Sequence, residues 1–415
     1  MTVDALEPAL AWDEGGITRV PYRVYEDPEI YAREQARLFR GPAWQFLGFA
    51  AELVKPGDFF TTQLGDTPII VVRDYDGAIN ALVNRCPHKA SVICYEARGS
   101  AKKLVCPYHN WTFDFTGALR GVAFRTGVDG MGGMPADFDM AAHNLIALKV
   151  DQIGGLLFGT FDHGARPLRD FLGAPMVANI ERTLSRPVQI LGKSTQVMHC
   201  NWKLYAENSR DTYHPSLLHS FATVFRLNRL SMEGGIEQDA AGWHHLIFAK
   251  RHIEKIAVAE YDENQLRSTG ASDTKLADPN VIKGWPEWPD GRTLTIMTLF
   301  PCFNLQQQVN SLATRQMVPL GPDKCELRWT FFGFVDDTDE QRLARIRQSN
   351  MFGPAGYIAL EDGTVGEFVQ RAVRNDPDGT TFIEMGGRGV GPSKTRATET
   401  SVRGFWRTWR QFMDL

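Results

Sequence analysis

The sequence predicts an α+β protein, with a small antiparallel β unit at about residues 42–157 and a larger part that mixes helices with antiparallel strands. Two observations predict the β unit. Short β-branched and apolar runs recur there, and Gly65-Asp66 and Asp76-Gly77 separate them as hairpin turns would. In the larger part, apolar residues recur at both strand and helix spacing. The length of 415 residues is enough for two or three domains.

Local signals predict the individual elements in order. A helix begins at Asp27, with Pro28 at its first position, and ends before Gly41. In the β unit, strands are expected at 59–64, 68–72, 78–83 and 155–158. Beyond it, helices are expected at 168–171, 176–183 and 202–218, and strands at 294–300, 305–314 and 325–334. A last amphipathic helix at 401–412 is expected to pack on the core through Val402, Phe405, Trp406, Trp409 and Phe412.

Composition and charge exclude several classes of partner. The net charge is −4 and no long basic block occurs, which argues against nucleic acids and anionic membrane surfaces. No run of 18 or more apolar residues could span a membrane. The first 16 residues lack a basic start followed by an apolar run, so no signal peptide is predicted. Apart from two in a metal motif, the six cysteines are scattered as in a reducing compartment, which predicts the cytoplasm.

Two short cysteine–histidine motifs are the strongest chemical signal in the chain. Cys86 and His88 form the first, and Cys106 and His109 form the second after seventeen intervening residues. A structural zinc ion could use this ligand set, whereas a Rieske [2Fe–2S] cluster binds both cysteines on one iron and both histidines on the other. One Cys and one His in each motif favours the cluster, because zinc motifs normally pair Cys with Cys. Trp111 and the proline after each cysteine indicate a stiff apolar rim.

A second candidate metal site follows the pattern Asp211-x-x-His214-x4-His219. Two histidines five residues apart lie about 140° apart on an ideal helix, too far round to share a metal. Pro215 favours a break between them, because the residue before a proline avoids the helical region. Two histidines and one carboxylate form the facial triad of non-haem Fe(II) oxygenases. The alternative is a polar or capping role for both histidines.

The third ligand of such a triad must come from elsewhere in the chain. The candidates are Glu361 and Asp362, which precede Gly363. Because they are adjacent, one can bind the metal while the other faces away. A solvent-exposed acidic turn is the alternative.

With these motifs the chain resembles the large (α) subunits of the Rieske non-haem iron aromatic-ring-hydroxylating oxygenases, over about residues 17–415. The resemblance implies a Rieske domain at 42–157 and a catalytic domain of the helix-grip (START-like) type at 1–41 and 158–415. It implies the following ligands: Cys86, Cys106, His88 and His109 for the cluster, and His214, His219 and Asp362 for a mononuclear Fe(II).

The resemblance also implies roles for residues that are not ligands. Asn208 is expected close to the mononuclear iron, and Asp211 is expected to bridge the two centres rather than to bind metal. Lys89-Ala90 departs from the Arg-Gly pair of many relatives. That departure is expected to change the surroundings of the cluster rather than its ligands.

Within the family, the chain is most similar to enzymes of aromatic acids. Gly132–Pro135, Leu227–Leu230 and Arg396–Ser401 look like terephthalate dioxygenases, whereas His214-Pro215 and Gln306–Ser311 look more like salicylate 5-hydroxylases. The implied reaction is cis-dihydroxylation of the terephthalate type, and ring monohydroxylation of the salicylate or aminobenzoate type is the alternative.

An aromatic carboxylate needs a cationic partner, and a planar guanidinium can bind both of its oxygens. Arg315 follows an apolar run and Arg396 precedes the last helix, so both are candidates for this role. The alternative for each is an ordinary surface arginine.

No G-x-G-x-x-G stands between a strand and a helix, so no flavin or NAD site is expected on this chain. A separate NAD(P)H-dependent reductase is therefore implied, with or without a ferredoxin. The resemblance also implies a homotrimer, with or without a small β subunit (α3β3), in which Asp211 accepts hydrogen bonds from His214 and from the partner subunit's His109.

Two other classes compete with the oxygenase. A Rieske electron-transfer protein needs the cluster but explains neither the extra ~250 residues nor the Asp-His-His segment. A zinc-stabilised binding module predicts a colourless protein.

Overall fold

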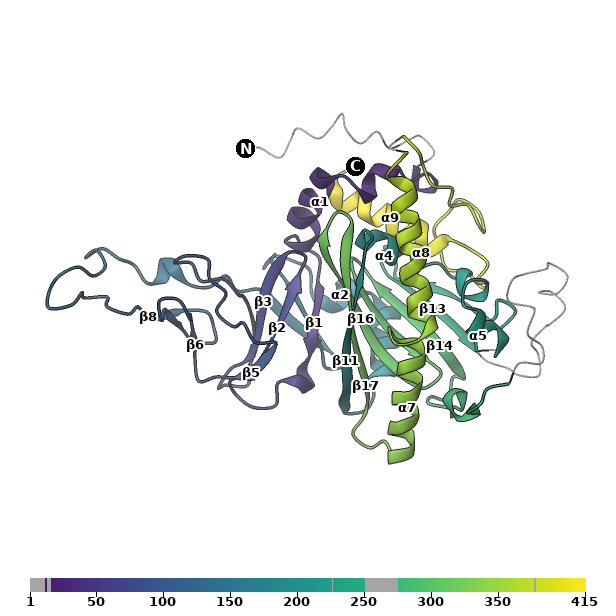
Figure 1. The fold of residues 1–415 in the computed structure, drawn as a ribbon, viewed down its shortest axis with the longest axis horizontal. Coiled ribbons are helices and arrows are strands. Elements are labelled where there is room, and N and C mark those ends of the chain that lie inside the picture. Colours follow the sequence, from purple (N-terminus) through teal and green to yellow (C-terminus); the bar gives the residue numbers. More distant parts are fainter. Residues whose placement is uncertain (1–11, 13–15, 226, 251–274, 377) are drawn as a thin grey trace. The chain divides into compact units, whose positions relative to one another are not determined.

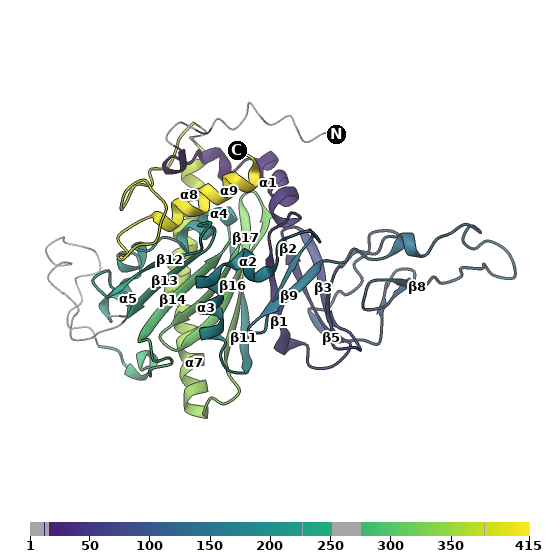
Figure 2. The same cartoon turned by 180° about the vertical axis from the view of Figure 1, so that it is seen from behind.

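The computed structural model describes Trp12 and residues 16–225, 227–250, 275–376 and 378–415. The chain divides into two compact units, residues 39–168 and residues 1–38 with 169–415 (Figure 1, and from behind in Figure 2). The prediction of no signal peptide concerns residues 1–16, of which only Trp12 and Gly16 are described. Within the described ranges, no helix is both long and apolar enough to cross a membrane.

The described part of the unit 39–168 contains three antiparallel sheets, ordered β1-β10-β9, β4-β3-β2-β5 and β6-β7-β8. The strands are β1 Gln45–Phe49, β2 Asp58–Leu64, β3 Thr67–Arg73, β4 Ile79–Val83, β5 Arg98–Ser100, β6 Leu104–Val105, β7 Thr112–Phe113, β8 Leu119–Gly121, β9 Lys149–Ile153 and β10 Leu156–Thr160. The predicted hairpin turns are confirmed: Gly65-Asp66 joins β2 to β3, and Asp76-Gly77 joins β3 to β4.

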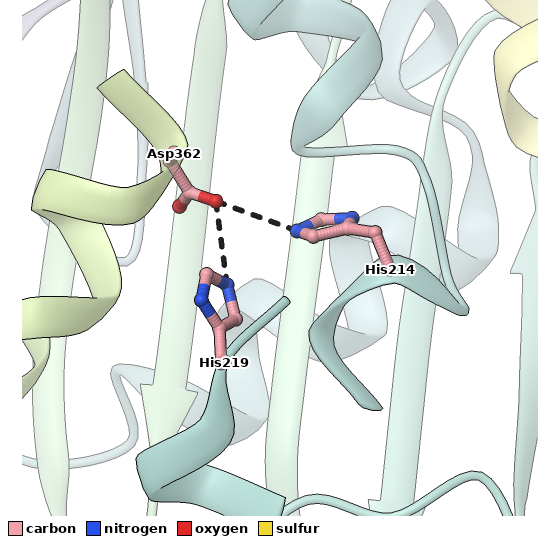
Figure 3. A group of neighbouring side chains, drawn as sticks. All are labelled: His214, His219 and Asp362. Atoms are coloured by element: carbon pink, nitrogen blue, oxygen red, sulfur yellow. Dashed lines mark ion pairs between the residues drawn. The ribbon is translucent and has the colours of Figure 1, made fainter. Parts of the chain in front are cut away.

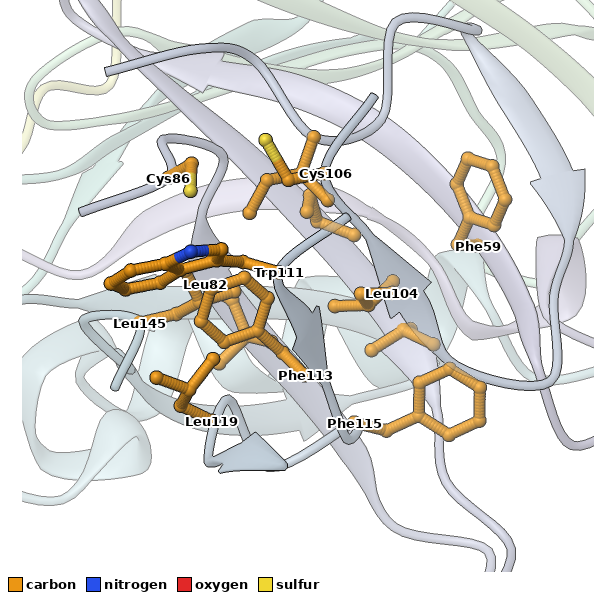
Figure 4. Close-up of a cluster of buried hydrophobic side chains, with 13 residues drawn as sticks. Phe59, Leu82, Cys86, Leu104, Cys106, Trp111, Phe113, Phe115, Leu119 and Leu145 are labelled. Carbon is orange, nitrogen blue, oxygen red and sulfur yellow. The ribbon is translucent and has the colours of Figure 1, made fainter. Parts of the chain in front are cut away.

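Strand β3 is buried on both faces, which ties the two apolar cores of this unit together. Ile69 and Val71 belong to one buried cluster, and Ile70 and Val72 belong to the other. The second cluster also contains Cys86 and Cys106, drawn in Figure 4 with Trp111. The cysteine motifs are therefore part of the core of the unit.

The larger unit is built on one antiparallel sheet of order β11-β17-β16-β15-β14-β13-β12. Its strands are β11 Val188–Met198, β12 Gly234–Gln238, β13 His245–Lys250, β14 Arg292–Leu299, β15 Phe303–Gln308, β16 Ser311–Gly321 and β17 Lys324–Phe334. Its helices are α1 Pro28–Glu34, α2 Leu168–Leu172, α3 Ala174–Thr183, α4 Trp202–Asn208, α5 Ser220–Val224, α7 Asp339–Phe352, α8 Tyr357–Val373 and α9 Thr400–Met413. The mixture of helices with an antiparallel sheet confirms the α+β class.

Helices cover both faces of this sheet. Asn179 on α3 contacts Met297 of β14, whereas the neighbouring residue Ile296 faces the other way. That other face carries α4, whose Tyr205 contacts Arg315 of β16. Figure 1 shows α7 and α8 in front of the sheet, and Figure 2 shows α3 on the opposite side.

A buried glutamate fixes α4 to the rest of the larger unit. Glu34 accepts hydrogen bonds from the indole N–H groups of Trp202 and Trp409 at 2.9 and 2.8 Å. The Lys203 ammonium lies 2.7 Å from the same carboxylate. Since α4 ends at Asn208, this ion pair holds the helix that leads into the histidine segment.

Two predicted elements are wrong. The strand expected at 305–314 is a hairpin of β15 and β16, whose turn at Val309-Asn310 contains no glycine or proline. The N–H of Asn310 is bonded to Gln348, and Val309 takes a φ of 56°, so tertiary contacts stabilise the turn. As a result Arg315 lies within β16 rather than after a strand.

The helix expected at 202–218 is also wrong, since α4 ends at Asn208. Asp211 Oδ1 accepts hydrogen bonds from the N–H groups of Tyr213 and His214, and a separate 3₁₀ turn, His214–Ser216, follows. The predicted break before Pro215 is therefore present, but the chain leaves the helix earlier than expected. The break lets both histidines face one direction.

Candidate metal centres and active-site cavity

The two cysteine–histidine loops share one backbone pattern. The Cys86 carbonyl accepts a hydrogen bond from Ala90 N–H at 2.9 Å, and the Cys106 carbonyl accepts one from Asn110 N–H at 3.0 Å. Ala90 and Asn110 adopt left-handed φ values of 58° and 54°. Each loop therefore presents its cysteine and histidine in nearly the same way.

The four side chains of these loops form a compatible donor set. Cys86 and Cys106 are buried, and burial together with the neighbouring Cys106 thiol raises the pKa of the Cys86 thiol. Figure 4 shows both sulfur atoms above the ring of Trp111. The imidazole rings of His88 and His109 lie 4.5 Å apart between centroids.

One buried histidine nitrogen indicates where a metal would bind. His109 Nδ1 is buried and has no hydrogen-bond partner among the described residues, as expected for an atom that binds a metal. His88 stacks on Trp111 with an interplanar angle of 3°, which fixes its ring. Two buried cysteines beside two adjacent imidazoles fit the ligand set of a Rieske cluster.

The second candidate centre is assembled from two distant segments. His214, His219 and Asp362 point toward one another, and their ligand atoms all lie within 4.8 Å of each other (Figure 3). Asp362 Oδ1 lies 3.4 Å from His214 Nε2 and 3.3 Å from His219 Nε2. Two imidazoles and one carboxylate in this arrangement fit the facial triad.

Close packing of α8 places Asp362. A side chain at Gly363 would come within 2.7 Å of Gln196 Nε2 on β11, so the absence of one lets the helix approach the sheet. Gln196 also donates a hydrogen bond to the Ala359 carbonyl at 2.9 Å. The acidic pair lies inside α8, so the alternative of an exposed acidic turn is wrong. Asp362 faces inward and is 5% exposed.

Neighbouring polar groups orient the triad. Glu361 Oε2 lies 2.8 Å from His219 Nδ1, so this carboxylate faces the far side of the ring. Asn208 Nδ2 donates to Asp362 Oδ1 at 3.1 Å, and Asp211 Oδ1 lies 3.7 Å from His214 Nδ1. The structure thus places Asn208 and Asp211 beside the triad, and gives Glu361 an orienting position.

The electrostatics of the triad favour a bound cation. Burial would lower the pKa of His214, but the nearby carboxylates of Asp211 and Asp362 reverse this and raise it to about 10. Burial would raise the pKa of Asp362, but the two histidines hold it far below its usual range. A buried carboxylate thus keeps its negative charge among imidazoles. A divalent metal ion would satisfy all three groups.

A cavity opens beside the triad and encloses about 660 Å³ of empty space, part of it open to solvent. Its walls are mainly apolar: they include Ala222, Leu227, Leu294, Ile296, Val309, Trp329, Phe352 and Ile358. The polar lining residues outside the metal segment are Asn228, Thr293, Gln308 and Arg315.

The two arginines proposed for the substrate lie in different places. Arg315 lines the cavity and is 4% exposed, so the surface alternative does not hold for it. Arg396 is 2% exposed and is not among the lining residues; its Nη1 donates to Asn228 Oδ1 at 2.6 Å. Only Arg315 faces the cavity directly.

Several functional candidates were missed from the sequence. Tyr205, which accepts a hydrogen bond from Arg315, gave no signal because it lies within a helical pattern. Gln308 and Trp329 line the cavity from two strands, and only the strand register brings them there. Asn228 stands in a segment noted for its similarity to relatives, but its place on the cavity wall could not be foreseen.

Comparisons with known proteins match both parts of the chain. Residues 43–129 match the Rieske [2Fe-2S] domain family, and residues 185–415 match the family described as ring hydroxylating alpha subunit (catalytic domain). The chain is 44% identical to terephthalate 1,2-dioxygenase, terminal oxygenase component subunit alpha 2, of Comamonas sp., over 98% of each chain. It is 42% identical to the anthranilate 1,2-dioxygenase large subunit of Burkholderia cepacia, over 99% of this chain and 96% of the relative.

A further relative and a solved structure agree. The chain is 39% identical to the large oxygenase component of salicylate 5-hydroxylase from Ralstonia sp., over 97% of this chain and 96% of the relative. The structure of naphthalene 1,2-dioxygenase from Rhodococcus sp. superposes with a TM-score of 0.79 at 24% identity, covering 95% of this chain and 94% of that chain. At that identity the superposition supports the fold alone.

Members of this family bind two cofactors, a Rieske [2Fe–2S] cluster and a mononuclear iron. The two donor sets described above fit these cofactors. Members of the family are terminal oxygenase components that use O2 on an aromatic substrate and take electrons from a separate reductase or ferredoxin. The chain belongs to the Rieske non-haem iron ring-hydroxylating oxygenases, as an α subunit.

Proposed function

We propose that this α subunit hydroxylates an aromatic carboxylic acid, with cis-dihydroxylation of the terephthalate type as its reaction. The observation that carries the proposal is the guanidinium of Arg315 on the cavity wall. Its Nη1 donates to the Tyr205 hydroxyl at 2.6 Å, whereas its Nε and Nη2 have no partner among the described residues. A buried guanidinium with two open donors is complementary to a carboxylate.

The metal ligands are assigned as follows. In a Rieske domain at 42–157, Cys86 and Cys106 hold one cluster iron, and His88 and His109 hold the other. In a catalytic domain at 1–41 and 158–415, the mononuclear iron is held by His214, His219 and Asp362. When bound, the cluster supplies electrons one at a time and the mononuclear Fe(II) supplies the centre at which O2 is activated.

The protein's own groups prepare these ligands. Glu361 accepts a hydrogen bond from His219 Nδ1, which leaves the Nε2 lone pair directed at Asp362 and the metal position. The Asn208 amide, by donating to Asp362 Oδ1, limits the rotation of that carboxylate. The apolar walls hold the ring of the substrate and exclude water, while Arg315 fixes its carboxylate end.

Ring monohydroxylation of the salicylate or aminobenzoate type is the second candidate. Its support is the 39% identity with the salicylate 5-hydroxylase component together with the segment Gln306–Ser311. A Rieske electron-transfer protein without oxygenase activity is the alternative of another class. The buried triad beside a cavity argues against it, because a carrier needs neither.

The family resemblance and one carboxylate oxygen of Asp211 support a proposal for the assembly. We propose a head-to-tail homotrimer, with or without a small β subunit, served by a separate NAD(P)H-dependent reductase, with or without a ferredoxin. Asp211 Oδ1 accepts from Tyr213 and His214, while no described residue donates to Oδ2, which leaves that oxygen for the partner subunit's His109. The six unpaired cysteines support a reducing compartment, and we propose the cytoplasm.

Product analysis tests the proposed function. The purified protein, with a reductase and NADH, is supplied with benzoates, salicylates and phthalates, and the products are identified by mass spectrometry. A cis-dihydrodiol from terephthalate supports the proposal, and a phenol from a salicylate or an aminobenzoate supports the second candidate. No product from any aromatic acid, with both metal centres loaded, would refute both.

A further inference from the structure

We propose that an open pocket in the unit 39–168, lined by Leu104 and Val105 beside Cys106, is the docking site of the protein that reduces the cluster. The shape and charge of this site fit a donor with an acidic surface and one apolar side chain that enters the pocket. The inference rests on the proposed function, which requires a separate electron donor. It adds where this donor binds and what chemistry its surface has.

The pocket offers an apolar surface that this chain does not cover itself. It encloses about 550 Å³ of empty space, part of it open to solvent. Its lining is apolar apart from Glu96 and Lys103. Two of the apolar lining residues, Tyr95 and Val105, are 77% and 38% exposed. Exposed apolar side chains around a pocket are typical of a surface that binds another protein.

The wall of the pocket is continuous with the cysteine loops. Val105 directly precedes Cys106, so their Cα atoms are about 3.8 Å apart. Leu104 and Cys106 belong to one buried cluster. Asn84, two residues before the first cysteine, donates a hydrogen bond from its Nδ2 to the Cys94 carbonyl on the pocket wall at 2.7 Å. A donor in this pocket would therefore lie one residue from a cluster ligand.

The pocket and the histidine ligands lie on different sides of Cys106. In the view of Figure 4, Leu104 lies on one side of Cys106 and Trp111 on the other. The ring of His88 stacks on Trp111, so the histidines belong to the Trp111 side. The proposed contact with the partner subunit uses that side. An electron donor needs another approach to the cluster, and the pocket provides it.

Positive charge is concentrated in the same part of the chain. Residues 85–103 contain five of the twelve basic residues of the unit 39–168, but only one of its twelve acidic residues. The ion pairs described in this unit join Arg40 to Asp66 and Arg120 to Asp114. The five basic residues of the segment are exposed and have no such pair among the described residues: Arg85, Lys89, Arg98, Lys102 and Lys103.

This charge identifies the kind of partner. The whole chain has a net charge of −4, so the excess of cations is local and not a general property of its surface. Unpaired cations around an apolar pocket steer an acidic protein toward it, and the apolar contact then holds that protein in place. One electron leaves the reduced donor and enters the oxidised cluster, where one ferric ion becomes ferrous. No bond is made or broken in the pocket.

The test measures how the reductase used for product analysis binds to the oxidised holoenzyme, by calorimetry at low and high ionic strength. Lys103→Glu reverses a charge in the pocket, so the reductase should bind at least about 10-fold more weakly at low salt. Tyr95→Ala removes an exposed apolar side chain, so the affinity should fall at least about 5-fold at both salt concentrations. Lys324→Glu, at an exposed position of β17, is the matched control and should bind as the unmodified protein does.

Stopped-flow kinetics test whether electrons use the same site. The reductase should reduce the cluster of Lys103→Glu more slowly than that of the unmodified protein. Photoreduced deazaflavin, a small reductant that needs no docking site, should reduce both clusters at the same rate. Equal slowing with both reductants would overturn the inference, because the substitution would then have altered the cluster itself.

Two further results would also overturn the inference. One is unchanged reductase affinity in both Lys103→Glu and Tyr95→Ala. The other is a monomeric Lys103→Glu variant that still binds the reductase normally, which would assign this surface to a second copy of the chain. If the reductase docks as predicted but no aromatic acid is hydroxylated, the proposed function fails while the docking site stands.

Discussion

The two donor sets of this chain are built in opposite ways. The four donors of the cysteine–histidine loops lie between Cys86 and His109, and each loop is closed by its own backbone hydrogen bonds. The triad instead joins His214 and His219 to Asp362, which comes 143 residues after His219 on another helix. A local motif can be recognised from its spacing alone, whereas a site made of distant segments depends on the sheet and helices that bring them together.

The largest effect on activity is expected when one ligand of the triad is removed. His214→Ala or Asp362→Ala removes one of three ligands and should abolish hydroxylation, because the mononuclear iron is lost. The visible spectrum of the cluster should remain, since its donors lie in the other unit. Iron analysis should fall from about three atoms per chain to about two. Full activity and iron in the Asp362 variant would move the ligand to Glu361.

The residue assigned to the junction of the two centres comes next. Asp211→Asn keeps the shape of the side chain but removes its charge, so both metal centres and the trimer should persist while most turnover is lost. Stopped-flow measurement of cluster oxidation in the presence of substrate and O2 would show where electrons stop. A fully active monomer would refute the proposed assembly.

The sequence was informative where chemistry is local. It predicted the hairpins at Gly65-Asp66 and Asp76-Gly77, and the helix that begins after Asp27, because turn and capping signals act over a few residues. It failed at the Val309-Asn310 turn, which is stabilised by Gln348 from α7 rather than by glycine.

The cavity was the least predictable part. Arg315 reaches it because β16 begins at Ser311 and continues to Gly321, beyond the predicted end of the strand at Thr314. Arg396 was expected at the substrate, but it is buried behind Asn228. Its neighbours in the sequence do not show whether an arginine faces a cavity or lies behind its wall. Register and burial, which decide these positions, are properties of the folded chain.

Arg315 offers a sharper test of the catalytic unit. Arg315→Gln should cost about 2–5 kcal/mol of binding free energy for an aromatic carboxylate, because the ligand's charge would lose its partner inside the protein. Calorimetry on the oxidised enzyme measures this without turnover. Gln316, the next residue, faces the other side of β16, so Gln316→Asn is the matched control. Equal affinity in the Arg315 variant would contradict its role.

A smaller effect is expected from the residue that orients His219. Glu361→Gln should weaken metal binding about 10- to 100-fold, since the amide holds the imidazole less firmly than the carboxylate does. Competition with a chelator, followed by iron analysis, measures the change. Glu340→Gln, on an exposed position of α7, should leave it unaltered.

The smallest effect tests the loop of the cluster. Ala90 adopts a φ of 58°, in the left-handed region where a side chain is strained, so Ala90→Gly should raise the free energy of unfolding by about 1 kcal/mol. Ala97→Gly, which removes no such strain, should lower it instead. Denaturation followed through the visible circular dichroism of the cluster distinguishes the two variants.

The central claim is that the catalytic unit adds oxygen to an aromatic acid anchored by Arg315. It is tested most directly by turnover of terephthalate under ¹⁸O2 with a reductase and NADH. The account predicts a cis-dihydrodiol in which both hydroxyl oxygens are labelled, and no such product from Arg315→Gln at the same substrate concentration. A product with a single labelled oxygen would contradict dihydroxylation, and an undiminished yield from the Arg315 variant would contradict the anchor.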